Sequence, residues 1–502
     1  MGQGHIRKGF FFYFGLFVLL LIAVFCICLV IMIFNPGKTV LWMQYFTAND
    51  HFLVTQTTDD SKTPINMNFL NNNVDTIEIN CTSYAQVLVQ RNRDEEFKQE
   101  GIHIINHAKG FQGANGAVHF DYNAILTGKT LTIDITEPNG FLNFSKDIKV
   151  VLATFTGNEY NNNFENINLK VNVVDGNFEV GNVGLNPKAV KLKGLTVDAK
   201  GKGSIVVGEK FDTSSLSTIS LSTNEGSILS HNKIAHESKY YSGLYANCDV
   251  KLETNSGKID LDMVKTDGKD LTINNEKGNV GIDFIKATNT NVVCKHGNYV
   301  FGTVDGNLNY AGTEDTMITP NIIVDYIAGN FALNGADKAE PDITIKKIDG
   351  NVQIFADKGK LDINEAKGEI EILSAGTFNT DIIVSDSNTN LISIETKSGK
   401  VNLSFAGVVG DAKIKTNSGK IVVNVTSTAS FVANSYQNSE GIDAENQEML
   451  GDGKINVSTE LLDGTTKNPL EVDDKDGEIN VYTNASVDYN LVNKTSLVVE
   501  QI

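Results

Sequence analysis

The residues that most often carry enzyme or metal chemistry are sparse in this sequence and form no familiar motif. Among its 8 histidines, His103 and His107 lie four residues apart. Their neighbours follow a strand pattern, in which positions four apart share a face without touching, so this spacing indicates surface histidines rather than a metal pair. No H-E-x-x-H, G-x-S-x-G or G-x-x-x-x-G-K-[ST] motif occurs. We therefore predict no catalytic residue, no cofactor and no metal site.

Acidic residues offer a second route to chemistry. The segment Asp473–Glu478 has the carboxylate density of a calcium loop, but it lacks the alternating spacing and the distal glutamate of such loops. Asp260 and Asp262, or Glu369 and Glu371, would form outward carboxylate ladders if strands stack. Ladders of this kind bind Ca²⁺ or act as the acid and base of a polysaccharide lyase or hydrolase. We interpret them as a solvated surface, and a polysaccharide-active β-helix enzyme is the less favoured alternative.

Aromatic side chains bind carbohydrate by stacking on sugar rings. Tyr240, Tyr241 and Tyr245 cluster in one segment, where the repeat described below is interrupted. A loop that projects from a regular body is a common place for ligand contacts. These three tyrosines are therefore the candidate ligand-contact residues.

The composition narrows the choice of partners. The chain of 502 residues has 42 Lys and Arg against 61 Asp and Glu, which leaves a net charge of −19. Phosphate binding needs clustered basic residues, so we expect no nucleic-acid partner. The 5 cysteines are too few for a disulfide framework. The 44 glycines and 7 prolines favour a repeat architecture over three ordinary domains.

An apolar segment near the N-terminus predicts a membrane anchor. Residues Gly9–Phe34 carry no charge and exceed the roughly 20 residues that span a bilayer. Two basic residues precede the segment, so the positive-inside bias places the N-terminus in the cytoplasm and the C-terminal body outside the cell or in the periplasm. Trp42 follows as an interfacial aromatic residue. The segment is longer than a signal-peptide core, which favours an uncleaved single-pass signal anchor over a cleaved peptide.

A repeat begins at about residue 167. Its unit is a turn that ends in glycine, followed by a strand of alternating polar and aliphatic residues, as in Thr254–Leu261. The alternation predicts that Ile259 and Leu261 are buried and that Asp260 and Asp262 face solvent. The turn glycine is predicted to adopt the positive φ that a tight corner demands. The repeat-turn glycines are Gly257, Gly278, Gly399, Gly419 and Gly477.

The spacing of the glycines is compatible with two architectures, a parallel solenoid and an antiparallel repeat. Several intervals are close to about 20 residues and others to half of that. Each unit exposes an apolar face that it cannot bury alone, whereas stacked units bury a continuous core. We therefore predict an all-β repeat solenoid, like a single-stranded β-helix, preceded by one N-terminal transmembrane helix. The half intervals also fit hairpins, so an antiparallel β-meander or propeller-like repeat is the alternative.

Breaks in these patterns define the expected organisation. From the N-terminus, the parts are a short cytoplasmic tail (1–8), the signal anchor (9–34), a juxtamembrane stalk (35–70), an N-terminal β region (71–166), the Gly-punctuated solenoid (167–483) with an inserted loop (427–450), and a C-terminal cap (484–502). The cap is expected to cover the last strand edges, where unpaired backbone invites aggregation.

Serial copies of the motif T-x-S-G-x-[IV], which start at Thr254, Thr396 and Thr416, follow a period-two strand pair within Val74–Gln90. This order resembles the bacterial putative-adhesin families built of β-strand repeats, including their autotransporter-adhesin-like head-domain type. The resemblance covers about residues 71–483. It implies a Gly-punctuated β-solenoid on a cell envelope, without known enzymatic activity and without catalytic residues to carry over.

Together these features predict a non-enzymatic, membrane-anchored cell-surface protein, either an adhesin or an envelope-organising binding protein. The expected partners are the membrane, which the chain spans once, and a cell-wall glycan, a surface glycan or another surface protein. A self-assembling structural surface scaffold is the alternative function.

Overall fold

Most of the described chain is β-strand, which confirms the predicted class. The computed structural model describes residues 13–27, 53–59, 65–66, 74–81, 86–89, 101–111, 121–136, 143–153, 166–174, 176–180, 190–208, 211–212, 216–230, 243–311, 318–335, 338–385, 391–406, 411–426, 431–437, 448–449, 455–457, 477–483 and 487–492. Residues 13–27 form a helix. Nearly all other regular elements of this part of the chain are strands.

The strands fall into three groups along the chain. The first group is β1 (Leu53–Asp59), β2 (Ile65–Asn66), β3 (Thr76–Cys81), β4 (Gln86–Val89), β5 (Gly101–Phe111), β6 (Asp121–Thr127), β7 (Thr130–Thr136) and β8 (Asn143–Ala153). The second is β9 (Asn168–Val174), β10 (Asn177–Val180), β11 (Val190–Lys191), β12 (Gly194–Lys200), β13 (Ile205–Val207), β14 (Phe211–Asp212), β15 (Thr218–Thr223), β16 (Ile228–Ser230), β17 (Gly243–Tyr245), β18 (Val250–Thr254), β19 (Ile259–Lys265), β20 (Leu271–Asn275), β21 (Val280–Cys294), β22 (His296–Ala311), β23 (Thr319–Ile327), β24 (Phe331–Asn334), β25 (Asp342–Ile348), β26 (Val352–Ala356), β27 (Gly359–Ala366), β28 (Ile370–Val384), β29 (Ile392–Ser398), β30 (Val401–Phe405), β31 (Ala412–Ser418) and β32 (Ile421–Thr426). The third is β33 (Phe431–Gln437), β34 (Glu448–Met449), β35 (Ile455–Val457), β36 (Gly477–Thr483) and β37 (Val487–Val492).

The N-terminal helix lies within the segment predicted to be the anchor. Its apolar side chains, such as Phe17 and Leu19, are exposed. Within the described residues, no helix has both the length and the apolar character needed to cross a membrane. Gly9, Phe34 and Trp42, which mark the predicted anchor and its interface, lie outside the described residues.

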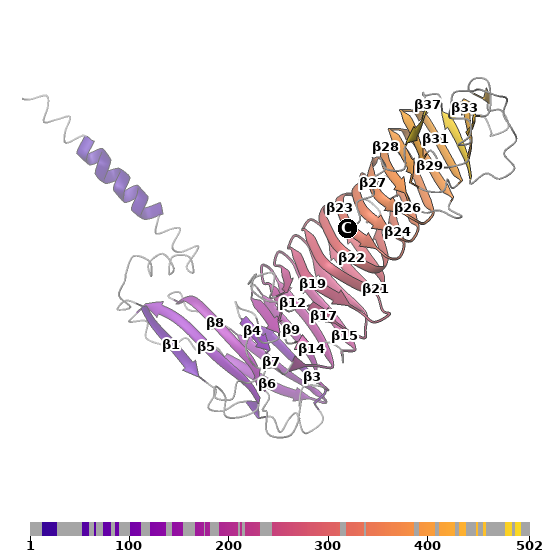
Figure 1. Ribbon diagram of the computed structural model, residues 1–502. Coiled ribbons are helices and arrows are strands. Elements are labelled where there is room, and N and C mark those ends of the chain that lie inside the picture. Colours follow the sequence, from indigo (N-terminus) through magenta and orange to yellow (C-terminus); the bar gives the residue numbers. More distant parts are fainter. Residues whose placement is uncertain are drawn as a thin grey trace, which may run out of the picture.

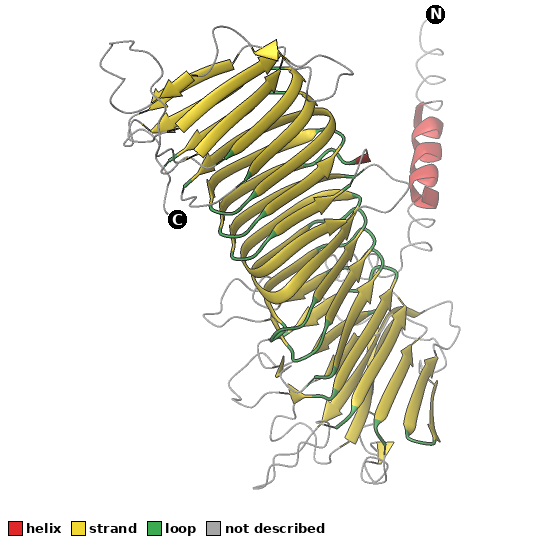
Figure 2. Cartoon of the chain, turned by 90° about the vertical axis from the view of Figure 1, so that its right-hand side faces the viewer, coloured by secondary structure: helices red, strands yellow, loops and turns green. Residues whose placement is uncertain are grey.

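The repeat strands pair in parallel along one axis, so the chain is a solenoid and not an antiparallel meander (Figure 1). We call the two main columns of strands stack A and stack B. Stack A runs β7, β3, β9, β12, β15, β18, β20, β21, β22, β24, β26, β28, β29, β31, β36. Stack B runs β8, β4, β10, β13, β16, β19, β21, β22, β23, β25, β27, β28, β30, β32, β37. The long strands β21, β22 and β28 turn a corner and belong to both stacks, so one circuit of the chain adds one strand to each (Figure 2).

The direction of pairing changes at both ends of the rod. At the N-terminal end, β5 pairs antiparallel with β1, β2 and β8, and β6 pairs antiparallel with β7. At the other end, β33 pairs antiparallel with β34 and β35. The segment predicted as a stalk therefore contributes β1 and β2 to the sheet. The segment 427–450 is likewise not a loop throughout, because β33 extends stack A through its parallel pairing with β36.

Aliphatic side chains fill the space between the stacks. Ile259 and Leu261 are fully buried, as the alternation predicted, but Asp262 is also buried, at 7 % exposure. Leu261 and Asp262 are buried in succession, and the Asp262 N–H donates to Ser230 Oγ at 3.2 Å. The predicted exposure of Asp262 was wrong because the alternation of buried and exposed residues is interrupted within β19.

Glycine is needed at these corners mainly because adjacent coils approach too closely to leave room for a Cβ, and less because of the φ angle. A Cβ on Gly257 would lie 1.5 Å from the carbonyl oxygen of Gly226, one coil away, and a Cβ on Gly278 would lie 1.8 Å from that of Gly257. The predicted positive φ was wrong for Gly257 and Gly278, which lack it. Any side chain at these positions would overlap the backbone of the adjacent coil.

Two other predicted turn glycines do have the expected backbone. Gly399 and Gly419 have φ of 134° and 119°, and a Cβ on Gly419 would lie 2.0 Å from the carbonyl oxygen of Gly399. Gly477 is the first residue of β36.

The residue three positions before a corner glycine holds the corner together. Thr254 Oγ1 accepts a hydrogen bond from the Gly257 N–H at 2.9 Å and lies 3.4 Å from the carbonyl oxygen of Gly226. In the next coil, Asn275 Oδ1 accepts from the Gly278 N–H at 2.6 Å, while its Nδ2 donates to the carbonyl oxygen of Gly257 at 3.3 Å. These buried side chains satisfy backbone groups of two coils at once.

We predict that Gly278→Ala lowers the free energy of unfolding by about 3 kcal/mol or more, because a Cβ there requires the backbone of the adjacent coil to move. The matched control is Gly281→Ala, three residues further, where the added Cβ meets the flexible Asp260 side chain at 3.3 Å. Chemical unfolding followed by far-UV circular dichroism measures both. Equal losses in the two variants would contradict the close-approach explanation.

A second prediction compares a buried threonine in a column of aliphatic residues, Thr290, with a buried threonine at a corner, Thr254. The Thr290 hydroxyl is buried without a hydrogen-bond partner among the described residues, between Leu271 and Leu308 in register. Thr290→Val should raise the free energy of unfolding by about 1 kcal/mol, because it removes an unsatisfied polar group. Thr254→Val should lower it by about 1–2 kcal/mol, because that hydroxyl bonds the corner. The same sign for both would show that the hydroxyl contacts do not determine these energies.

Candidate functional site

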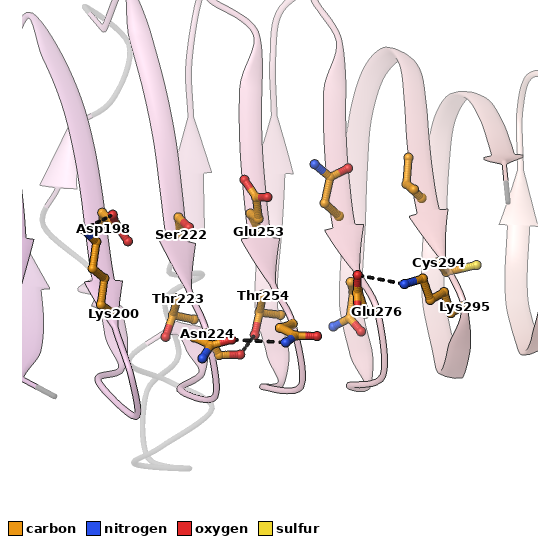
Figure 3. A pocket seen from close by; sticks show the side chains of 14 residues that line it. Asp198, Lys200, Ser222, Thr223, Asn224, Glu253, Thr254, Glu276, Cys294 and Lys295 are labelled. Atoms are coloured by element: carbon orange, nitrogen blue, oxygen red, sulfur yellow. Dashed lines mark hydrogen bonds and ion pairs between the residues drawn. The ribbon is translucent and has the colours of Figure 1, made fainter. Parts of the chain in front are cut away.

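A polar groove of about 410 Å³ crosses the outer face of stack A. Its walls come from β12, β15, β18, β20 and β21, which lie side by side in Figure 3. The groove runs across the strands near the corners of the coils. One ligand would therefore contact several coils at once.

A row of outward side chains in register lines the groove. The register pairs Asp198 with Ser222, Ser222 with Glu253, Glu253 with Asn274, and Asn274 with Val293. Each is half-buried, and Figure 3 shows the labelled members aligned across the strands. Because adjacent strands lie about 4.8 Å apart, the row presents one side chain at each such step.

A second row lies where the strands turn. Asn255 Nδ2 donates a hydrogen bond to Asn224 Oδ1 at 3.2 Å, and Lys295 Nζ donates to Glu276 Oε1 at 2.9 Å (Figure 3). Both bonds join neighbouring coils. They fix this row of side chains as one edge of the groove.

The carboxylates of the groove are paired with lysines. Asp198 lies 3.8 Å from Lys200, and Glu253 lies 2.6 Å from Lys251 on the same strand. Glu276 pairs with Lys295, as described above. These pairs are solvent-exposed, so each contributes at most about 1 kcal/mol to stability. Their larger effect is that the groove presents little uncompensated charge.

The groove contains a cysteine that is unsuited to nucleophilic chemistry. Cys294 is 1 % exposed, and burial raises the pKa of its thiol to about 12. Burial also raises the pKa of the Cys248 thiol. A nucleophilic cysteine needs a lowered pKa, because the thiolate is the reactive form. Among the residues that the structure describes, no group of three or more His, Cys, Asp or Glu could hold a metal ion.

Of the predicted ligand-contact tyrosines, the structure describes Tyr245, which does not line this groove. Tyr245 lies on β17, which pairs with the end of β19, away from stack A. Lys265 Nζ lies 2.6 Å from Tyr245 Oη and 4.2 Å from the centre of the ring, and this hydrogen bond raises the pKa of Lys265. Tyr240 and Tyr241 lie outside the described residues.

A separate row of half-buried side chains runs along the rod from the strand that pairs with β17, and its first two members are apolar. The register aligns Met263 with Phe284, Phe284 with Thr303, and Thr303 with Tyr326. The Tyr326 hydroxyl donates to Asp349 Oδ2 at 2.6 Å, which raises the pKa of Tyr326 to about 12. Because that hydrogen bond occupies the Tyr326 hydroxyl, the apolar contact of this row comes from Met263, Phe284 and the Tyr326 ring.

Asp260 and Glu371 do not align with other carboxylates in the register, so they do not form the predicted ladders. Asp260 lies between Leu229 and Gly281 in register, and Glu371 lies between Gln353 and Ser393.

The groove was not predicted from the sequence, because its residues look like ordinary outward strand positions. The available signal was their place just before a turn glycine in successive repeats.

The chain has low similarity to solved structures of putative adhesins. A putative cell adhesion protein from Clostridium sporogenes is 9% identical, with 88% of this chain and 99% of that chain covered and a TM-score of 0.16. A putative adhesin from Bacteroides fragilis is 12% identical (64% and 97% covered, TM-score 0.21), and one from Parabacteroides distasonis is 10% identical (75% and 98%, TM-score 0.13). No family model and no curated protein matches the chain.

We predict that the Cys294 thiol is unreactive in the folded protein. At pH 8, alkylation by iodoacetamide should be slower than in the urea-unfolded chain by at least about 100-fold, because burial suppresses the thiolate. Mass spectrometry of the peptides measures the rate at each cysteine. Alkylation of Cys294 at the unfolded rate under native conditions would contradict its assignment as an inert wall of the groove.

Proposed function

We propose that the chain is a non-enzymatic, adhesin-like cell-surface protein, whose solenoid holds binding surfaces away from a membrane. The observation that carries the proposal is the in-register groove on a continuous parallel solenoid. In such a solenoid, each coil contacts only its neighbours, and binding is spread over a long face rather than held in one deep pocket.

Polar ladders on the outside support the role of a stiff spacer. Asn307 Nδ2 donates to Asn289 Oδ1 at 3.0 Å, and Asn307 Oδ1 accepts from the Asn330 N–H at 2.9 Å. The Asn351 N–H continues the ladder to Asn330 Oδ1 at 2.8 Å. Successive coils are thus bonded through side chains as well as through the strand backbones. These additional bonds between coils are consistent with a spacer role.

The proposal includes a membrane anchor at 9–34, with the N-terminus in the cytoplasm. It is supported by the uncharged apolar composition of that segment and by the basic residues before it. The non-enzymatic part is supported by the absence of catalytic motifs from the sequence and by the protonated Cys294 thiol in the groove.

Binding of the purified full chain, in detergent micelles, tests this function. We expect saturable binding to at least one of three targets: cell-wall glycan, surface glycans of other cells, or intact cells. Light scattering on the same sample reports self-association. A folded chain that binds none of the targets would overturn the adhesin-like function, and assembly into long polymers would favour the structural scaffold instead.

A further inference from the structure

We propose that the groove on stack A binds a neutral, hydroxyl-rich linear glycan laid across the strands. The inference rests on the proposed function and specifies its ligand class and its site. The groove residues concerned are Asp198, Ser222, Asn224, Glu253, Asn255 and Asn274.

The dimensions of the groove suit a chain molecule. The row from Asp198 to Val293 crosses five strands in unbroken register. Four spacings of about 4.8 Å give a length of about 19 Å. A pyranose unit in an extended chain is comparable in length to one strand spacing, so successive sugars would meet equivalent positions on successive coils.

The polar groups match hydroxyls. Asn224, Asn255 and Asn274 each carry an amide with donors and an acceptor, and the Ser222 hydroxyl also does both. A sugar hydroxyl likewise donates and accepts, so it can satisfy such groups without a net charge. Val293, half-buried at the end of the row, provides an apolar surface for the C–H groups of a sugar ring.

The charges of the groove argue against charged polymers. Asp198, Glu253 and Glu276 are each within 4 Å of a lysine. A polyanion would approach carboxylates on a chain whose net charge is −19. A polycation would gain contacts only by displacing the paired lysines. A neutral ligand leaves all three pairs in place.

The backbone argues against an extended peptide. Peptides commonly bind sheets by adding a strand to a free edge. The strands under the groove have neighbours on both sides: β15 lies between β12 and β18, and β18 lies between β15 and β20. Recognition here must therefore come from side chains.

Calorimetric titration of the full chain with defined hexasaccharides tests the proposal. The probes are chitohexaose and cellohexaose as neutral chains, hexagalacturonate as an acidic chain, and a lysine-rich peptide as a cation. We expect binding of a neutral hexasaccharide and at least tenfold weaker binding of both charged probes.

Two matched variants locate the site. Ser222→Arg fills the groove and should weaken binding of the neutral probe at least tenfold. Ser393→Arg introduces the same side chain at a half-buried outward position of stack A, on β29 outside the groove, and should leave affinity unchanged. If Ser222→Arg lowers the unfolding midpoint, Asn274→Ala replaces it, with an expected loss of at least threefold.

Each other result overturns the proposal in a recognisable way. Equal affinity of Ser222→Arg, or of Asn274→Ala, and the unmodified chain would show that the groove is not the site. Tighter binding of hexagalacturonate or of the peptide would overturn the neutral-glycan class. If the folded chain binds cells but no neutral hexasaccharide, the groove proposal fails and the adhesin-like function stands. If the folded chain binds neither cells nor any glycan, the adhesin-like function fails too.

Discussion

The close approach of successive coils at their corners is the constraint on which the rest of the structure depends. At Gly257 and Gly278 the space for a side chain is occupied by the carbonyl oxygen of the glycine one coil away. This contact sets the corner positions of neighbouring coils relative to one another. The strands that leave the corner are then in register, with their aliphatic residues stacked in continuous columns.

The corners also solve the problem of buried backbone groups. Thr254 and Asn275 each bind the backbone at the corner glycine of their own coil and reach the glycine of the coil before. The hydroxyls of Thr290 and Thr380 instead lie in the core without a partner among the described residues. A threonine hydroxyl therefore stabilises the fold at a corner, as in Thr254, but destabilises it within a column of aliphatic residues, as in Thr290. At the ends of the rod, antiparallel strands replace the parallel winding.

The groove is a direct consequence of this register. Because equivalent outward positions of successive coils align, four polar residues and one apolar residue form a row across the strands. Each strand supplies one member of this row, so the row exists only where the coils stack. The arrangement suits a ligand that is itself a repeat, and it explains how a surface of ordinary strand residues becomes a candidate site without any catalytic motif.

The amino-acid pattern by itself determined the all-β class and the buried aliphatic positions, since the alternation at Ile259 and Leu261 follows from strand geometry. The glycine spacing favoured a solenoid, but only the tertiary structure decided that the repeat strands pair in parallel. The pattern could not determine which polar residues meet, because coil length varies: Asn224 and Asn255 are 31 residues apart, whereas Glu276 and Lys295 are 19 apart. The burial of Asp262, the strands inside the predicted stalk and insertion, and the groove were decided by the tertiary structure. All of these features depend on how segments distant in the sequence pair with one another. The local alternation of polar and aliphatic residues does not predict that pairing.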